Sequence, residues 1–242
     1  GMLRRLTLQA LPGMTLGMLL ELLVRQRFRV APAYFPRLGY LVATGMVNSL
    51  FRLFEEWDNG SSIRAMRIEP PPILILGQWR SGTTLLHQLL ARHPGFHAPT
   101  LYQCLFPHHF AYTQRRGAAL FNWLAPRTRP MDQVALSAGV PYEDEFALAA
   151  LGGSSPYLRC LFPQAADDRR MALGLRQLSP EDLAQWRATF RFYLQKLMFT
   201  KGRRLVLKSP PHTGRVGVIL ESRLGLRDGR REFLKGELPD VL

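Results

Sequence analysis

The sequence has few cysteines and no long apolar run, and both scarcities exclude classes of protein. Its 242 residues contain two cysteines, Cys104 and Cys160, too few for a disulfide framework or a cysteine-ligated metal site. We therefore expect a reducing, cytoplasmic location and no bound metal. The most apolar stretch, residues 11–24, contains Glu21, is too short to cross a membrane and lacks a signal-peptide cleavage site. This stretch reads as an amphipathic helix.

Acidic residues and lysine are also scarce. The chain contains 18 Asp and Glu against 32 Lys and Arg, a formal net charge of +14, and only four of the basic residues are lysine. This balance favours an anionic partner such as a nucleotide, a sulfated or phosphorylated group, or an acidic membrane surface. A merely solvated basic surface explains the charge equally well. We expect no nucleic-acid binding, because no organised recognition motif accompanies the charge.

Apolar periodicity and turn residues predict a helical N-terminal region. Residues 12–55 read as mostly helical, with a break near Pro32 and Pro36. Residues 58–63, Asp-Asn-Gly-Ser-Ser-Ile, read as a turn that ends this region.

Two short apolar runs beyond this region predict buried parallel strands. They are residues 71–77, Pro-Pro-Ile-Leu-Ile-Leu-Gly, and residues 203–210, in which the strand ends at Lys208. A helix pattern follows the first run from Thr83, and the strongest helix pattern of the chain precedes the second run, over residues 180–201. Strands that alternate with helices in this way predict an α/β fold.

Residues 77–84, Gly-Gln-Trp-Arg-Ser-Gly-Thr-Thr, form a glycine-rich loop between the first strand and its helix. Backbone N–H groups in such a turn, at a helix N-terminus, form an anion-binding site. The glycines permit close approach of the anion, the hydroxyls add donors, and the guanidinium adds a fixed charge. We predict that the ligand contacts Gln78, Trp79, Arg80, Ser81, Gly82, Thr83 and Thr84.

The loop departs from the common nucleotide-binding loop at one position. Thr83 stands where a Walker loop has lysine, the residue that reaches the β- and γ-phosphates of ATP or GTP. A nucleotide kinase-like protein is therefore the less favoured alternative.

Arg-Ser-Gly-Thr-Thr-Leu-Leu at residues 80–86, after an apolar strand, resembles the 5′-phosphosulfate loop of sulfotransferases, the enzymes that use 3′-phosphoadenosine 5′-phosphosulfate (PAPS). Residues 102–110, 143–148 and 205–215 resemble further segments of the bacterial branch of this family, in similar order. The resemblance implies a P-loop-type three-layer α/β core with a parallel sheet. It also implies PAPS as co-substrate and transfer of its sulfuryl group to a hydroxyl or amine acceptor.

In the family, a cation directly before Ser-Gly-Thr-Thr binds the 5′-phosphate side of PAPS, a role that the resemblance assigns to Arg80. A lysine at a comparable strand end contacts the transferring group, and Lys208 takes that role by resemblance. Both cations should emerge at the same edge of the sheet, because ligands bind at the carboxyl ends of parallel strands.

The general base is less determined, because members of the family use a glutamate or a histidine. Glu143 belongs to the dense acidic cluster of residues 143–145, where neighbouring charges could raise a carboxyl pKa. The same acids could equally well serve only to stabilise a helix N-terminus. His212, four residues after Lys208, is the second candidate, and His108 and His109 are further alternatives.

The resemblance ends near Gly217, and we expect the chain to be truncated relative to the family. We expect a helical region at residues 1–69, a sulfotransferase-like domain at 70–221 and an atypical charged tail at 222–242. Two strands would leave exposed sheet edges that favour self-association into a homo-oligomer. An inactive protein that binds PAPS or another anion is the alternative to an enzyme. The expected partners are a small-molecule, lipid or carbohydrate acceptor and a membrane surface touched by the N-terminal helices.

Overall fold

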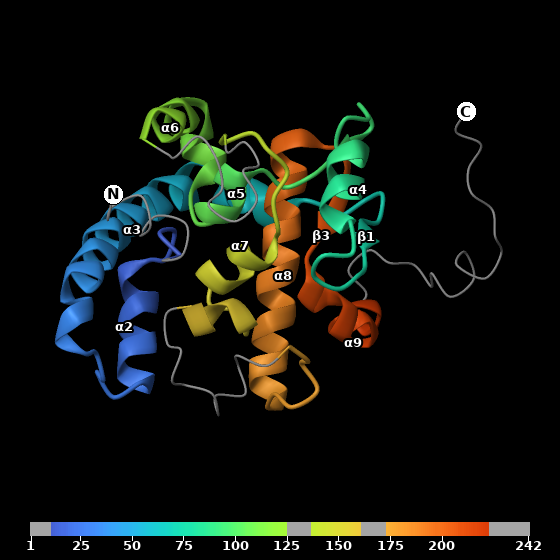
Figure 1. Cartoon of the computed structure of the whole chain (residues 1–242). Coiled ribbons are helices and arrows are strands. Elements are labelled where there is room, and N and C mark those ends of the chain that lie inside the picture. Colours follow the sequence, from blue (N-terminus) through green and yellow to red (C-terminus); the bar gives the residue numbers. More distant parts are fainter. Residues whose placement is uncertain (1–10, 125–136, 161–172, 223–242) are drawn as a thin grey trace.

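The computed structural model describes residues 11–124, 137–160 and 173–222 (Figure 1). In these ranges a short sheet lies between helices, and the two N-terminal helices pack against each other, with the second also packed against the helix at residues 180–201. The expected tail lies outside the described residues, apart from Ser222. The elements in chain order are α2 (Leu16–Arg25), η1 (Pro32–Tyr34), α3 (Phe35–Ala65), β1 (Ile73–Ile75), α4 (Thr83–Leu90), β2 (Phe96–His97), α5 (Leu101–Leu105), α6 (Phe110–Leu124), α7 (Glu145–Ala150), η2 (Pro156–Cys160), α8 (Pro180–Lys201), β3 (Arg204–Lys208), η4 (Pro210–Arg215) and α9 (Val216–Glu221).

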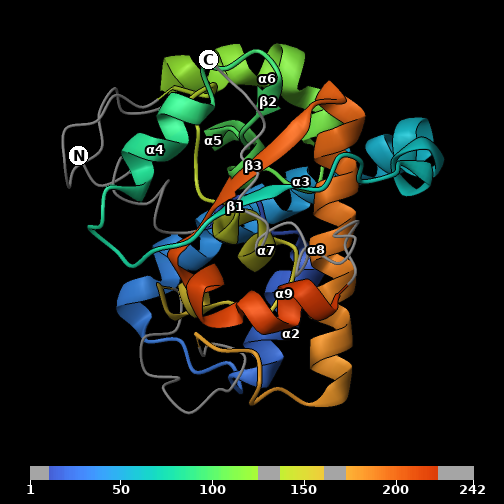
Figure 2. The ribbon, with the colours of Figure 1, turned by 90° about the vertical axis from the view of Figure 1, so that its right-hand side faces the viewer.

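The sheet is parallel and has the order β1-β3-β2 (Figure 2). β3 pairs with β1 so that Lys208 lies opposite Ile75, and with β2 so that Leu205 lies opposite His97. The two predicted strands are therefore confirmed, but the expectation of only two was wrong. The sequence did not predict β2, because this strand has only two residues, directly after Pro94-Gly95, and is too short to show a periodic pattern.

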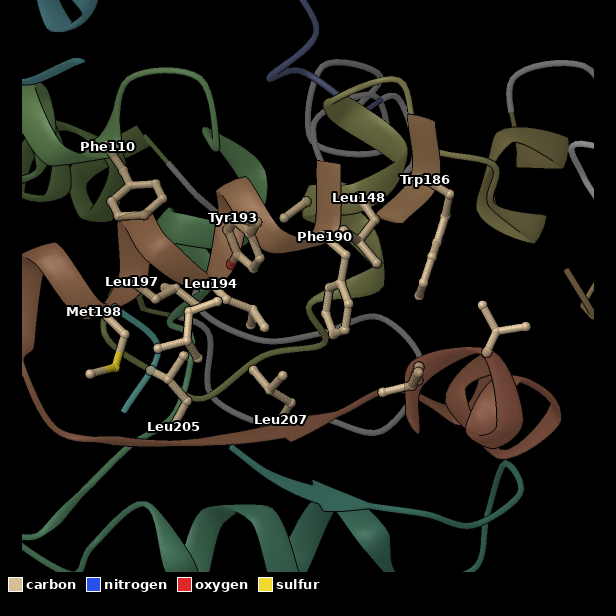
Figure 3. Close-up of a cluster of buried hydrophobic side chains, with 14 of the residues drawn as sticks. Phe110, Leu148, Trp186, Phe190, Tyr193, Leu194, Leu197, Met198, Leu205 and Leu207 are labelled. Atoms are coloured by element: carbon tan, nitrogen blue, oxygen red, sulfur yellow. The ribbon is translucent and has the colours of Figure 1, made fainter. Parts of the chain in front are cut away.

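The sheet is covered on both faces, as the P-loop-type three-layer fold requires. α8 packs on one face of β3 and α4 on the other (Figures 2 and 3). Between α8 and β3 lies a core of buried side chains, which includes Trp186, Phe190, Tyr193, Leu205 and Leu207 (Figure 3). Because α8 carries the largest of these side chains, it determines how the sheet sits against the N-terminal half of the chain.

The ends of α8 follow directly from its sequence. The Ser179 side chain accepts a hydrogen bond from the backbone N–H of Asp182 at 3.1 Å, and Pro180 occupies the first turn. At the other end Gly202 takes a left-handed conformation, with φ 59°, which a residue with a side chain adopts only at a cost. The helix therefore ends where β3 can begin two residues later.

The N-terminal region is helical as predicted, but the turn expected at residues 58–63 lies inside α3 and was wrong. The helix continues there because Ile63 is buried and Gln195 of α8 donates to the carbonyls of Arg64 and Met66. Tertiary packing thus overrides a turn-like composition. Of the helices that the structure describes, none is both long enough and apolar enough to cross a bilayer.

Candidate active site

The predicted anion loop connects β1 to α4. β1 ends at Ile75, Gly82 stands directly before α4 with φ 81°, and the helix begins at Thr83. The first backbone N–H groups of a helix have no partner within it, so the N-terminus of α4 presents free donors to the loop. The strand, glycine turn and helix are therefore arranged as an anion site requires.

Gly77 is needed for the shape of the loop. A methyl group at this position would lie 2.6 Å from Cγ2 of Thr83 and 2.9 Å from Oγ of Ser81. The Gly77 N–H donates to Oγ1 of Thr213 at 2.9 Å, and that hydroxyl donates to the Gly77 carbonyl at 3.1 Å. Thr213 thereby fastens the loop to the segment that follows β3.

The loop side chains remain accessible. Arg80 is exposed and takes a left-handed conformation with φ 68°, and no carboxylate of the described residues forms an ion pair with it. Ser81 donates its hydroxyl proton to the carbonyl of Gln78 at 2.6 Å, which closes the turn. The guanidinium is thus available to a ligand at the mouth of the loop.

Lys208 and Glu143 form an ion pair beside the loop. Lys208 ends β3, opposite the last residue of β1, and its Nζ lies 2.5 Å from Oε1 of Glu143. The lysine side chain is 6% exposed and the glutamate 20% exposed. The structure therefore brings the predicted cation and the first candidate base together, across 65 residues of sequence.

Tyr157, which sequence reasoning missed, links this pair to the loop. Its hydroxyl donates a short hydrogen bond to Oε2 of Glu143, and the Trp79 side chain hydrogen-bonds to Tyr157. Burial, followed by the negative charge of Glu143, raises the pKa of Tyr157 far above its ordinary value, so it stays a donor. No local signal in the sequence around Tyr157 points to this contact, because η2 approaches Glu143 only in the folded chain.

His212, the second candidate base, lies in a closed network behind the pair. Its Nε2 is 2.6 Å from Oδ2 of Asp144, whose Oδ1 accepts from the Ser209 hydroxyl at 3.0 Å. All three residues are fully buried. The structure therefore places His212 against Asp144, where no acceptor substrate can contact it directly.

Burial and pairing act in opposite directions on this network. Burial opposes ionisation of Asp144, but the charge of His212 and hydrogen bonds from His212 and Ser209 outweigh it, so the pKa of Asp144 lies below 3.8. Burial also opposes the charged form of His212, but Asp144 outweighs it and raises the pKa of His212 above 6.5. Both shifts therefore favour the charged forms of the two side chains.

The acidic cluster at residues 143–145 divides among three different partners. Glu143 takes Lys208 and Asp144 takes His212, while Glu145 makes a buried two-bond contact with Arg215 at 3.0 and 2.8 Å. Of the three acids only Glu143 is partly exposed.

The other two candidate histidines are engaged elsewhere. His108 hydrogen-bonds to the carbonyl of Ala150, and His109 bonds to Asn48 of α3 and Thr113 of α6. Burial is the first cause that lowers their pKa values, to about 3 for His108 and about 4 for His109. His108 thus joins its segment to α7, and His109 joins it to α3.

The sequence profile of the sulfotransferase family matches residues 71–222, which contain the loop, the Lys208–Glu143 pair and the buried network. The chain belongs to the sulfotransferase family. This settles the family of the chain, in agreement with the resemblance of the loop. Among the described residues of this sulfotransferase-family chain, no group of three His, Cys, Asp or Glu side chains could hold a metal ion.

Two curated relatives and two solved structures are similar to the chain. The relatives are the omega-hydroxy-beta-dihydromenaquinone-9 sulfotransferases Stf3 of Mycobacterium bovis and Mycobacterium tuberculosis, each 38% identical over 205 residues, or 84% of this chain. The chain spans about half the length of these relatives, 52%. One structure is sulfotransferase STF9 of Mycobacterium avium, which has 23% sequence identity and a TM-score of 0.47, with 72% of this chain and 45% of that chain covered. The other is sulfotransferase STF1 of M. tuberculosis, which has 18% sequence identity and a TM-score of 0.45, with 78% of this chain and 50% of that chain covered.

Proposed function

We propose that this chain transfers a sulfuryl group from PAPS to an acceptor hydroxyl or amine. The observation that carries the proposal is the position of the Lys208–Glu143 pair beside an open anion loop, joined to it through Tyr157 and Trp79. Neither part alone would suggest group transfer. Together they supply an anion holder, a cation for charge that develops during the reaction, and a carboxylate for a proton.

The loop residues suit the phosphosulfate end of PAPS. Gly77 lets Ser81 and Thr83 approach its backbone, where a methyl group would clash with both, and Thr83, Thr84 and the α4 N-terminus supply donors. Arg80 supplies a planar charge with several donors, which matches a phosphate or sulfate oxygen pair. When bound, PAPS would supply the activated sulfuryl group, and these residues would hold and orient it.

Glu143 and Lys208 divide the remaining chemistry. Glu143 would take the proton of the acceptor as the acceptor oxygen or nitrogen bonds to sulfur, and Lys208 would stabilise the phosphate oxygen whose bond to sulfur breaks. In the free protein Lys208 and Glu143 neutralise each other's charge across 2.5 Å. A negatively charged ligand can therefore take the place of Glu143 beside Lys208 without leaving the lysine uncompensated. Asp144, next to Glu143 in the chain, would hold the segments of both residues together through its hydrogen bonds to Ser209, next to Lys208, and to His212.

Apolar residues around the loop support an apolar, lipid-like acceptor. Trp79, Leu85 and Leu86 are exposed on the loop and the first turn of α4, although large apolar side chains are usually buried. The relatives with curated names act on a menaquinone derivative, as those names state. For this chain we propose that the acceptor is the hydroxyl of a small molecule or lipid, and that the reaction takes place in the cytoplasm.

The decisive experiment compares thermal unfolding with adenosine 3′,5′-bisphosphate, AMP and ATP. The bisphosphate, which keeps the nucleotide part of PAPS, should raise Tm by several degrees at a hundredfold excess over Kd, equivalent to about 2.7 kcal/mol. Arg80→Ala should abolish most of this rise. The matched control is Arg92→Ala, an exposed arginine just beyond α4, which should leave the rise unchanged.

Three outcomes would overturn the proposal in different ways. Equal shifts with AMP and the bisphosphate would favour an inactive anion-binding protein without a 3′-phosphate site. A magnesium-dependent shift with ATP alone would favour the kinase-like alternative. A bisphosphate shift that survives Arg80→Ala would place the nucleotide elsewhere on the chain.

A further inference from the structure

The turn between α2 and α3 exposes three aromatic side chains at one tip of the molecule. Phe28, Tyr34 and Phe35 are 61%, 55% and 56% exposed. The turn itself is well bonded, because the Phe28 N–H donates to the Leu23 carbonyl and the Val30 N–H to the Phe28 carbonyl, both at 2.8 Å. These aromatics therefore project from an ordered tip rather than from a loose loop.

An apolar row continues from this tip along the exposed face of α3. The exposed positions recur every three or four residues, which keeps them on one side of the helix over about five turns. The opposite side is buried against α2, α6 and α8. The row comprises Phe35, Gly39, Ala43, Met46, Leu50 and Leu53, and it ends before the acidic residues Glu55, Glu56 and Asp58.

The same segment carries charge of one sign. Residues 22–54 contain five arginines and neither Asp nor Glu. Arg27 and Arg29 are exposed on either side of Phe28, and Arg52 is exposed between Leu50 and Leu53. An apolar face bordered by arginine, in a stretch without acids, complements a surface that is apolar inside and anionic at its boundary.

We propose that residues 22–54 of the α2–α3 hairpin dock on the surface of an anionic phospholipid bilayer. The tip aromatics enter the headgroup region, Arg27 and Arg29 pair with lipid phosphates, and the apolar row of α3 lies along the interface. The hairpin rests on the surface, since no described helix can span the bilayer. It lies on the side of the molecule away from α4 (Figure 1), so this inference does not depend on sulfuryl transfer.

The charge pattern favours a lipid surface over a second copy of the chain. Residues 22–54 carry five arginines and no acid, and the whole chain carries +14, so two copies facing each other through this surface would repel. An apolar row bordered by acids and bases of both signs would have pointed to a protein partner instead.

Vesicle flotation tests the proposal with the full chain. Vesicles of phosphatidylcholine with about one-third phosphatidylglycerol should carry the protein upward at about 0.15 M salt, and pure phosphatidylcholine vesicles should carry much less. Arg27→Ser with Arg29→Ser should weaken partitioning about thirtyfold, because each arginine near an anionic surface contributes about fivefold. Phe28→Ser with Phe35→Ser should weaken it at least as much, since both lose apolar contact with lipid.

The control pair is Arg92→Ser with Arg203→Ser, which removes the same charge from exposed positions outside the hairpin. It should retain binding within about twofold, and circular dichroism melts should show that all variants stay folded, since surface changes alter stability little. Equal binding by both arginine pairs would overturn the proposal by showing attraction through net charge alone. A homodimer in light scattering that the phenylalanine pair dissociates, without vesicle binding, would overturn it in favour of a second copy.

Discussion

Replacing Asp144 with asparagine should strongly destabilise the fold, in a way that depends on pH. Asp144 is fully buried, and its carboxylate accepts hydrogen bonds from Ser209 at 3.0 Å and His212 at 2.6 Å. Asparagine keeps the size of the side chain and an acceptor for Ser209. It removes the negative charge that raises the pKa of buried His212.

The magnitude follows from the burial of both partners. Breaking a buried ion pair by removing one partner costs about 3–5 kcal/mol, because the remaining charge is left uncompensated. His212 can lower this cost by losing its proton and accepting from the new amide. We therefore expect the lower end of the range, a loss of about 3 kcal/mol in the free energy of unfolding.

The sign of the pH dependence follows from the two shifts. Asp144, with its lowered pKa, contributes stability that is complete above pH 3.8 and is lost as pH falls through its folded pKa. His212, with its raised pKa, contributes stability that is complete below pH 6.5 and is lost as pH rises through its folded pKa. The difference between wild type and variant should thus be largest between pH 3.8 and 6.5 and should shrink on both sides.

Urea denaturation of both proteins across this pH range measures the effect. The slope with denaturant should be unchanged, so that the midpoint alone reports the loss. Asp58→Asn, the same chemical change at an exposed position of α3, should alter stability by less than about 0.5 kcal/mol. An Asp144 variant as stable as wild type, or a loss that is constant across the range, would refute the reasoning.

Three further changes test other contacts of the structure. Tyr157→Phe removes the hydroxyl that donates to the proposed base, so kcat/KM for sulfuryl transfer should fall about tenfold, and an unchanged value would exclude a positioning role. Lys196→Met leaves buried Glu55 without its cation and should lower the free energy of unfolding, measured by urea denaturation, by about 3–5 kcal/mol. Adding Glu55→Gln in a double variant should restore most of this loss, and no recovery would contradict the pairing. Gly82→Ala, at φ 81°, should lower stability by about 1–2 kcal/mol, whereas Gly39→Ala on the exposed face of α3 should raise it by about 0.5–1; melting temperatures that move together would be inconsistent with both.

Local chemistry was sufficient to predict the anion loop and the elements around it. Gly77 and Gly82 mark a turn between an apolar strand and a helix whatever the rest of the chain does, because dihedral freedom and periodicity belong to the segment itself. The N-cap at Ser179 and the stop at Gly202 defined α8 for the same reason. The two-residue strand β2 lacked such a signal, and its pairing with β3 depends on a neighbour about 108 residues away.

The sequence by itself determined the loop, its arginine and the family to which the chain belongs, because these depend on residues that are adjacent in the chain. Only the tertiary structure decided which acid faces which base. α7 begins only at Glu145, so Glu143 and Asp144 lie in the chain that leads into it. Glu143, Asp144 and Glu145 face three different partners, each held in place by β3 or the segment that follows it. That division leaves Glu143 beside the loop and encloses His212, and no spacing in the sequence could have shown it.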